Sequence, residues 1–218
     1  MLVFFQIKMM MKKFLSILIV SVLSVVMAVA QPSGYTLQSG DAQTALTKSI
    51  STASSQLKSL KVNFTQEKSS KAFTTPAKSE GTLSYQQPDL LCWAYTSPKA
   101  YSIILNKKGA YLKTAKGSTQ NKMIGEMAGM ILKTISGSGL TSNADFDATF
   151  YKGKDVLVML SPKSKRVKDM YQSIEVYLNP TTYLATQVKM TDKNGDVTTI
   201  KFSNHQKNTT LPAGTFNE

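Results

Sequence analysis

Two hydrophobic periodicities divide the chain. Through most of residues 61–202, apolar and polar positions alternate, which is the pattern of half-buried β-strands. The segment KVNFTQEK, for example, places Val62, Phe64 and Gln66 on one face. About ten such runs follow one another, and hairpin-type turns separate several of them: Lys107-Lys108-Gly109, Lys152-Gly153-Lys154, Asn179-Pro180-Thr181-Thr182 and DKNGD at 192–196. The pattern predicts a mainly β (α+β) fold: a barrel, an incomplete antiparallel barrel or a strongly curved sheet of about ten strands.

A helical period of three and four residues occurs near the start of this region. It predicts one amphipathic helix over 41–60, with Ser39 or Asp41 as its N-cap. The apolar positions that define it are Ala42, Leu46, Ile50, Ala53, Leu57 and Leu60. The polar residues 31–40 ahead of it predict a flexible N-terminus, and 41–218 a single domain.

The alternation breaks once more, at QNKMIGEMAGMILKTIS, residues 120–136. A helix there would carry Met123, Met127, Met130 and Ile131 on one stripe. Two interpretations remain open. The stripe could pack against the sheet as ordinary core, or it could form a movable lid, because flexible thioethers suit surfaces that accept variable apolar ligands.

The first thirty residues have the features of a secretory signal peptide. Lys12 and Lys13 precede the apolar run FLSILIVSVLSVVMAVA, which ends in the small-residue pattern Ala28–Ala30. We expect cleavage before about Gln31 and export of the mature chain, with a retained membrane anchor as the alternative. Met9, Met10 or Met11 would open a signal of more usual length than Met1 does.

Charge and composition narrow the function classes. The chain has a formal net charge of +13, or +10 without the three lysines of residues 1–30. A basic surface could meet nucleic acid, an anionic membrane or an acidic partner. Export argues against nucleic acid, and the lysines are scattered along the sequence.

Catalytic and metal-binding patterns are weak. The single histidine, His205, lies in a polar stretch, and there is no Gly-x-Ser-x-Gly motif to present a serine to it. DKNGD resembles the start of a calcium loop but lacks the closing glutamate, so a hairpin turn is the better interpretation. Cys92, the only cysteine, lies in an apolar strand. We therefore expect no enzyme activity, no metal and no cofactor.

Strand parity assigns a common face to the most apolar segment. We expect Leu83, Tyr85 and Gln87, before Pro88, to point to the same side of the sheet as Leu91, Trp93 and Tyr95 after it, with Cys92 on the other side.

The order of these features resembles the periplasmic outer-membrane lipoprotein carrier (LolA-like) family. After an amphipathic helix come Phe64-Thr65-Gln66, then Gly81-x-Leu83 and the pattern Pro88-x-Leu90-x-x-Trp93-x-x-x-x-Pro98. Further similarities cover most of the remaining chain: Leu160-x-Pro162-Lys163, the strand Ile174–Leu178, Asp192 to Gly195, and Phe216.

The resemblance implies an incomplete barrel whose open, concave side is covered by helices, with an apolar cavity for lipoprotein acyl chains between them. The residues expected to line it are Leu83, Tyr85, Leu91, Trp93, Tyr95, Phe146 and Phe150, with Met123, Met127, Met130 and Ile131 on the lid. The family's usual latch arginine corresponds to Gln87, which has no charged guanidinium.

The resemblance also implies partners: an inner-membrane ATP-driven exporter and an outer-membrane acceptor, served in the periplasm by a monomer. The leading hypothesis is therefore a soluble lipoprotein carrier. The alternative is a cell-envelope lipid-binding or interaction protein that uses the curved sheet for docking. An enzyme dependent on His205 is a third, weaker hypothesis.

Overall fold

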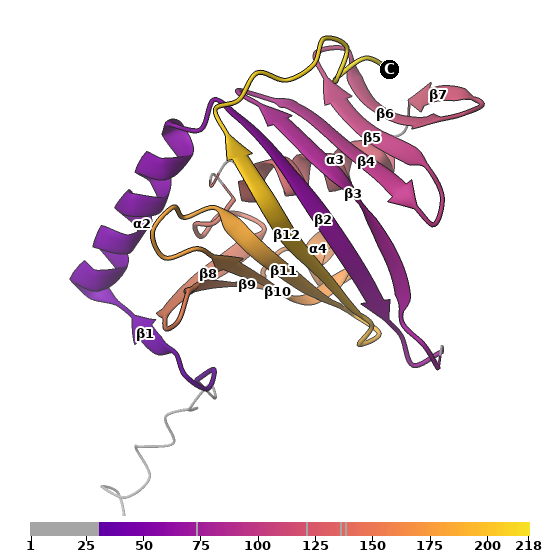
Figure 1. Cartoon of the computed structure of the whole chain (residues 1–218). Helices are drawn as coiled ribbons and strands as arrows, with labels where there is room; N and C mark the ends of the chain where they lie inside the picture. Colours follow the sequence, from indigo (N-terminus) through magenta and orange to yellow (C-terminus); the bar gives the residue numbers. More distant parts are fainter. Residues whose placement is uncertain (1–30, 73, 121, 136, 138) are drawn as a thin grey trace, which may run out of the picture. The chain divides into compact units, whose positions relative to one another are not determined.

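A single antiparallel sheet organises the chain (Figure 1). The computed structural model describes residues 31–218 apart from 73, 121, 136 and 138, and only the backbone of 122, 123, 127, 131 and 135. The predicted signal peptide, 1–30, lies outside the described residues. The strands are β1 (Thr36–Gln38), β2 (Ser59–Ser69), β3 (Ala77–Gln86), β4 (Leu90–Ser97), β5 (Tyr101–Asn106), β6 (Gly109–Thr114), β7 (Gly117–Gln120), β8 (Phe146–Lys152), β9 (Val156–Pro162), β10 (Tyr171–Leu178), β11 (Ala185–Asp192) and β12 (Val197–Lys207).

The sheet is open. Its strand order is β1-β8-β9-β10-β11-β12-β2-β3-β4-β5-β6-β7, and every neighbouring pair is antiparallel. The long strands β2 and β12 pair at its centre, so residues far apart in sequence meet there. The predicted antiparallel, incompletely closed sheet is confirmed, with twelve strands instead of about ten.

Two strands were not predicted. β1 lies in the segment expected to be flexible, where it pairs with β8 and the Tyr35 hydroxyl donates to Asp155. β7 is short and entirely exposed, so it has no apolar alternation to reveal it.

Helices α2 (Gly40–Ser55), α3 (Lys122–Ile135) and α4 (Lys165–Lys168) complete the described elements. α2 ends earlier than predicted, because the chain turns after Ser55 and the Asn208 side chain accepts the Lys58 backbone N–H at 2.8 Å. Leu57 and Leu60 remain buried without being helical. Among the described residues, no helix is both long and apolar enough to cross a bilayer.

Two apolar clusters fill the space between the sheet and the helices. The first joins Leu46 and Ile50 of α2 to β8, β9 and β10. The second joins β2, β3, β4 and β5 through Trp93 and its neighbours and includes Ala128 of α3. Met190 and Phe202 pack against both clusters. A cavity lined by residues of both clusters lies at this junction.

Candidate ligand-binding cavity

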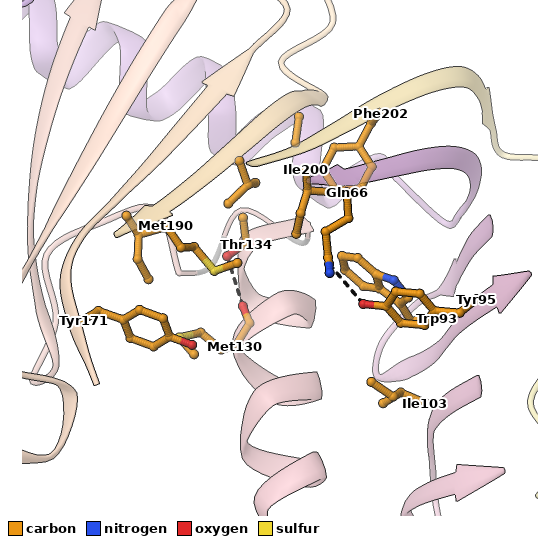
Figure 2. Close-up of a pocket in the computed structure, with 13 residues that line it drawn as sticks. Gln66, Trp93, Tyr95, Ile103, Met130, Thr134, Tyr171, Met190, Ile200 and Phe202 are labelled. Atoms are coloured by element: carbon orange, nitrogen blue, oxygen red, sulfur yellow. Dashed lines mark hydrogen bonds between the residues drawn. The ribbon is translucent and has the colours of Figure 1, made fainter. Parts of the chain in front are cut away.

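A cavity of about 90 Å³ lies between the sheet and α3 (Figure 2). Helix α3 contributes Met130 and Thr134, and the remaining walls come from strands on both sides of the central β2–β12 pair. The lining residues are Gln66, Trp93, Tyr95, Ile103, Met130, Thr134, Tyr171, Ile174, Ala185, Val188, Met190, Ile200 and Phe202. The cavity therefore depends on the correct pairing of the two halves of the sheet.

The lining is chemically apolar with few polar groups. Thr134 donates from its hydroxyl to the Met130 carbonyl at 3.0 Å, which satisfies it within its own helix. The Tyr95 hydroxyl donates to Gln66 Oε1 at 3.1 Å. Burial raises the pKa of Tyr95 and of Tyr171, so both phenols are neutral at physiological pH. None of the described residues that line the cavity has a charged side chain.

Aromatic rings form one wall. The Phe64 ring centroid lies 4.9 Å from that of Trp93 and 5.0 Å from that of Tyr95, and Tyr95 stacks on Tyr101 at 4.4 Å. Phe202 meets the Trp93 ring edge-on at 6.2 Å. Such offset and edge-on contacts hold rings in fixed positions. These rings form the aromatic side of the cavity.

A larger groove of about 490 Å³ adjoins the cavity and shares Met130, Thr134, Tyr171 and Ile174 with it. Charged residues at its rim connect α3 to α4. Arg166 lies 2.8 Å from an Asp145 carboxylate oxygen and 3.7 Å from one of Glu126.

The Asp145 carboxylate is held by a second group as well. Ser164 donates to Asp145 Oδ1 at 2.7 Å. This hydrogen bond, followed by the charge of Arg166, holds the pKa of Asp145 below its usual value. The rim of the groove is thus a polar seam between α3 and the strands.

The cavity is smaller than most ligand-binding sites. Sites for drug-sized ligands enclose about 300–1,000 Å³, so a cavity of about 90 Å³ is closed to a long acyl chain. Among the described residues, the helical part of its wall comes from α3 alone.

The structure brings together part of the predicted cavity wall. Trp93, Tyr95 and Met130 line the cavity. Leu83 lines a separate space of about 10 Å³ beside His205, and Phe146 lines the groove. Tyr85, Leu91 and Phe150 are buried without lining any of these spaces. Phe146 and Phe150 belong to the first cluster and Trp93 to the second, so they do not form one wall.

The predicted lid and latch are placed less completely. The side chains of Met123, Met127 and Ile131 lie outside the described part of the structure. Gln87 is exposed in the turn after β3, where its backbone N–H donates to the Lys58 carbonyl at 2.8 Å. Among the described residues, its side chain makes no hydrogen bond to α3. The polar contact to α3 comes instead from Arg166.

Sequence reasoning missed several lining residues. Ile200 and Phe202 alternate in β12, a detectable signal, but their proximity to Trp93 depends on β12 pairing with β2. Tyr171 and Met190 come from strands β10 and β11 in the other half of the sheet. Only the pairing order brings them to the cavity.

The residues considered for chemistry lie away from it. Cys92 points from β4 toward Ser102 on the opposite face, and burial raises the pKa of its thiol. His205 Nε2 lies 2.8 Å from the Ala185 carbonyl oxygen. Within the described residues, no three His, Cys, Asp or Glu side chains gather as a metal site would require.

Comparison with known proteins identifies the family. A sequence model of the family described as "Outer membrane lipoprotein carrier protein LolA" matches residues 55–218. The chain belongs to the LolA family. The match contains every residue that lines the cavity, whereas most of α2 precedes it. No curated protein sequence matches the chain.

Several solved structures are similar to this LolA-family chain at low sequence identity. A LolA superfamily protein from Nitrosomonas europaea is 13% identical, with a TM-score of 0.46 over 79% of this chain and 97% of that one. MucB, solved also with MucA from Pseudomonas aeruginosa, is 10% identical, with a TM-score of 0.50 over 82% of this chain and 64% of MucB. The lipoprotein LppX of Mycobacterium tuberculosis is 11% identical, with a TM-score of 0.40 over 78% and 98%.

Proposed function

We propose that this LolA-family protein is a non-catalytic, monomeric periplasmic carrier. It binds lipoprotein acyl chains in the cavity beneath α3, receives them from an inner-membrane ATP-driven exporter and delivers them to an outer-membrane acceptor. The observation that carries the proposal is an apolar cavity between an open sheet and helix α3, with no charged side chain among the described residues that line it.

The energetics of transfer favour this architecture. Each methylene buried from water is worth about 0.8 kcal/mol, so a chain leaves a bilayer only for an equally apolar environment. A permanently open cavity would expose its lining to water when empty. Closure by α3 hides that lining, and the weak rim contacts of Arg166 let the helix leave again.

A variant inside the cavity tests the proposal. Met130→Glu places a carboxylate in the apolar lining while the residue stays partly exposed, so the protein should fold. We expect its apparent affinity for lauric acid, measured by displacement of 1-anilinonaphthalene-8-sulfonate, to be at least about tenfold lower than that of the wild type. The control is Leu37→Glu, at an exposed apolar residue 48% accessible and outside the cavity.

The alternative is an envelope protein that docks partners on its curved sheet without carrying lipid. In that case Met130→Glu would bind lauric acid as the wild type does, or neither protein would bind it. Native mass spectrometry of the protein purified from its own envelope would identify the cargo. Co-purified lipoprotein would support the carrier function, and free lipid alone would support lipid binding without lipoprotein transport.

A further inference from the structure

Basic residues gather at one edge of the sheet. The antiparallel strand order places five connections at this edge: β9–β10, β11–β12, β2–β3, β4–β5 and β6–β7. They consist of residues 163–170, 193–196, 70–76, 98–100 and 115–116. Together these connections contain eight basic and two acidic residues. We call this edge of the sheet the basic edge.

The opposite edge of the sheet is almost neutral. Its four connections are residues 153–155, 179–184, 87–89 and 107–108, which contain three basic and two acidic residues. The connections therefore sum to a charge of +6 at the basic edge and +1 at the opposite edge. The lysines are scattered along the sequence, but the fold concentrates their charge at one end of the curved sheet.

Most cations of the basic edge have no acidic partner. Arg166 pairs with Asp145, and Lys163 pairs with Asp147. Among the described residues, the other six basic side chains are exposed and form no ion pair: Lys71, Lys99, Lys116, Lys165, Lys168 and Lys193. Their charges are therefore available to a partner.

The remaining acids of this edge are mostly engaged. Asp196 lies 3.7 Å from Lys68. Asp192 Oδ1 accepts the backbone N–H groups of Asn194 at 2.8 Å and of Asp196 at 3.0 Å. Asp169 is exposed and forms no ion pair within the described part of the chain. Unpaired lysines thus outnumber unpaired acids at this edge.

The groove of about 490 Å³ lies at the basic edge. Three of its lining residues mark strand ends at this edge: Phe146 begins β8, Leu160 lies near the end of β9, and Tyr171 begins β10. Val167 and Met170 of the β9–β10 connection line it as well. The groove and the unpaired lysines therefore share one end of the molecule.

Met170 is an exposed apolar residue of the basic edge. It is 37% exposed, and its carbonyl accepts the Lys193 backbone N–H at 3.1 Å, so two connections meet there. Lys165 and Lys168 lie at the surface of the same connection. An apolar side chain among lysines suits a bilayer interface, where the apolar group enters the acyl boundary and the ammonium groups meet the headgroups.

The composition of the basic edge favours a membrane over a protein partner. Seven of its eight basic residues are lysines, and lysine is depleted in protein–protein interfaces. An anionic leaflet attracts lysines near its surface without requiring a specific geometry. The lysines also lie on five separate connections. They match an extended charged surface better than one compact binding site.

We propose that the basic edge docks the protein on an anionic lipid bilayer. Lys165, Lys168 and Lys193 contact the headgroups, Met170 enters the interface, and the groove faces the lipid. Each lysine contributes a weak, reversible interaction, which suits a protein that leaves the membrane again. The inference goes beyond the proposed function, because docking requires no acyl chain in the cavity.

Vesicle co-sedimentation tests the docking. The exported protein is mixed with vesicles of phosphatidylcholine, alone or with an equal part of phosphatidylglycerol. We expect at least about twentyfold tighter binding to the anionic vesicles at about 50 mM salt, and loss of most of this preference at about 500 mM, where charges are strongly screened. Equal binding to both vesicles would overturn the proposal. Binding to neither would also overturn it and would favour an acidic protein partner.

Charge variants assign the binding to the basic edge. Lys165→Gln combined with Lys168→Gln removes two exposed charges. Each lysine near an anionic surface is worth about fivefold in affinity, so we expect about twentyfold weaker binding to anionic vesicles. The matched control, Lys107→Gln with Lys154→Gln, removes the same charge from the opposite edge and should weaken binding less than about twofold. Equal losses in both pairs would mean that net charge, and not the basic edge, determines binding.

An environment-sensitive label tests the orientation. The structure describes two exposed large apolar side chains, Met170 at the basic edge and Leu37, which pairs with Tyr151 near the opposite edge. In a Cys92→Ser background, Met170→Cys and Leu37→Cys each carry a nitrobenzoxadiazole fluorophore. Anionic vesicles should shift the emission of the label at residue 170 to shorter wavelength and leave the label at residue 37 unchanged. A shift at residue 37 alone, or at neither residue, would contradict the proposed orientation.

Lauric acid binding separates this inference from the proposed function. The variant with Lys165→Gln and Lys168→Gln should bind lauric acid as the wild type does, because neither lysine lines the cavity or the groove. Vesicle docking without lauric acid binding would refute the carrier and support the docking surface. Lauric acid binding without vesicle docking would refute the docking surface and leave the carrier intact.

Discussion

Trp93 is the residue on which the cavity wall depends. It is buried, and its ring contacts Phe64, Tyr95 and Phe202. These neighbours come from three strands, β2, β4 and β12. The indole therefore connects the centre of the sheet to one side of it, and its loss would affect both packing and the shape of the cavity.

Removal of the Trp93 ring should destabilise the protein strongly. We expect Trp93→Ala to lower the free energy of unfolding by about 3–5 kcal/mol, the usual cost of truncating a buried aromatic residue, and Trp93→Phe to cost less. Urea unfolding followed by far-ultraviolet circular dichroism measures both. Leu37→Ala, at an exposed position, should change stability by less than about 0.5 kcal/mol. A cost for Trp93→Ala as small as that of Leu37→Ala would contradict the packing described.

Asp145 predicts a pH dependence at the rim of the groove. Its folded-state pKa is held below the ordinary value of 3.8, first by the hydrogen bond from Ser164 and then by Arg166. The carboxylate therefore contributes stability above the unfolded pKa, and that contribution is lost as the pH falls through the lower folded pKa.

Unfolding of the wild type and of Asp145→Asn between about pH 5 and about pH 2 tests this. The difference in free energy of unfolding should shrink as the pH falls. A difference that stays constant over this range would mean that Asp145 does not titrate with folding. Asp147→Asn is a suitable control, because that carboxylate is paired with exposed Lys163.

Strand parity correctly predicted the face on which a side chain lies where the alternation within a single strand determines that face. Leu91 and Trp93 are buried on one face of β4, and Cys92 lies on the other, as alternation requires. Phe146 and Phe150 are also buried, as predicted. Their assignment to the wall around Trp93 required knowledge of strand order, which alternation within one strand does not contain.

At the scale of elements, α3 borders the cavity, and the proposed carrier function requires it to move. It packs against β5 and β6, and its Met130 and Thr134 complete the cavity wall. Gly125 allows close approach to β6, since a Cβ at that position would lie 3.1 Å from the Cβ of Ala110. The distance is close to the range in which two cysteines can be bridged.

A reversible cross-link between α3 and β6 should therefore block uptake. In a Cys92→Ser background, Gly125→Cys combined with Ala110→Cys should form a disulfide after small shifts of the backbone. The oxidised protein should fail to bind lauric acid, and reduction with dithiothreitol should restore binding. Each single cysteine variant controls for the substitutions. Full binding by the oxidised, cross-linked protein would show that ligand enters without movement of α3.

Elements were predictable where their pattern was local. The ten predicted strand segments all correspond to strands, and the Met-rich segment forms α3. The exposed edge strand β7 and the four-residue α4 have too few apolar positions to reveal them. β1 exists because of the partner strand β8 and the Tyr35–Asp155 hydrogen bond, both more than 100 residues away. The predicted helix over 41–60 extends beyond the observed end of α2. Leu57 and Leu60 continue the helical spacing in the sequence, although the chain has already turned toward β2 at Leu57 and is part of β2 at Leu60.

At the scale of the whole domain, the unit Gly34–Glu218 combines a sheet that does not close with a small cavity between that sheet and α3. The C-terminal residues follow β12 and reach the far strands, where Asn106 Nδ2 donates to the Phe216 carbonyl at 3.0 Å and Lys108 pairs with Glu218 at 2.6 Å. These contacts fasten the C-terminal segment to the strands β5 and β6, against which α3 also packs.

The central claim is that an acyl chain occupies the space between α3 and the sheet. Photolabelling with a lauroylglycerol that carries a diazirine at the end of its chain, followed by peptide mass spectrometry, tests it most directly. We predict labels on cavity residues of both halves of the sheet and of α3, foremost Met130, Met190 and Phe202, and their loss on competition with lauric acid. Labels that resist competition and concentrate on exposed residues such as Leu37 would contradict the account.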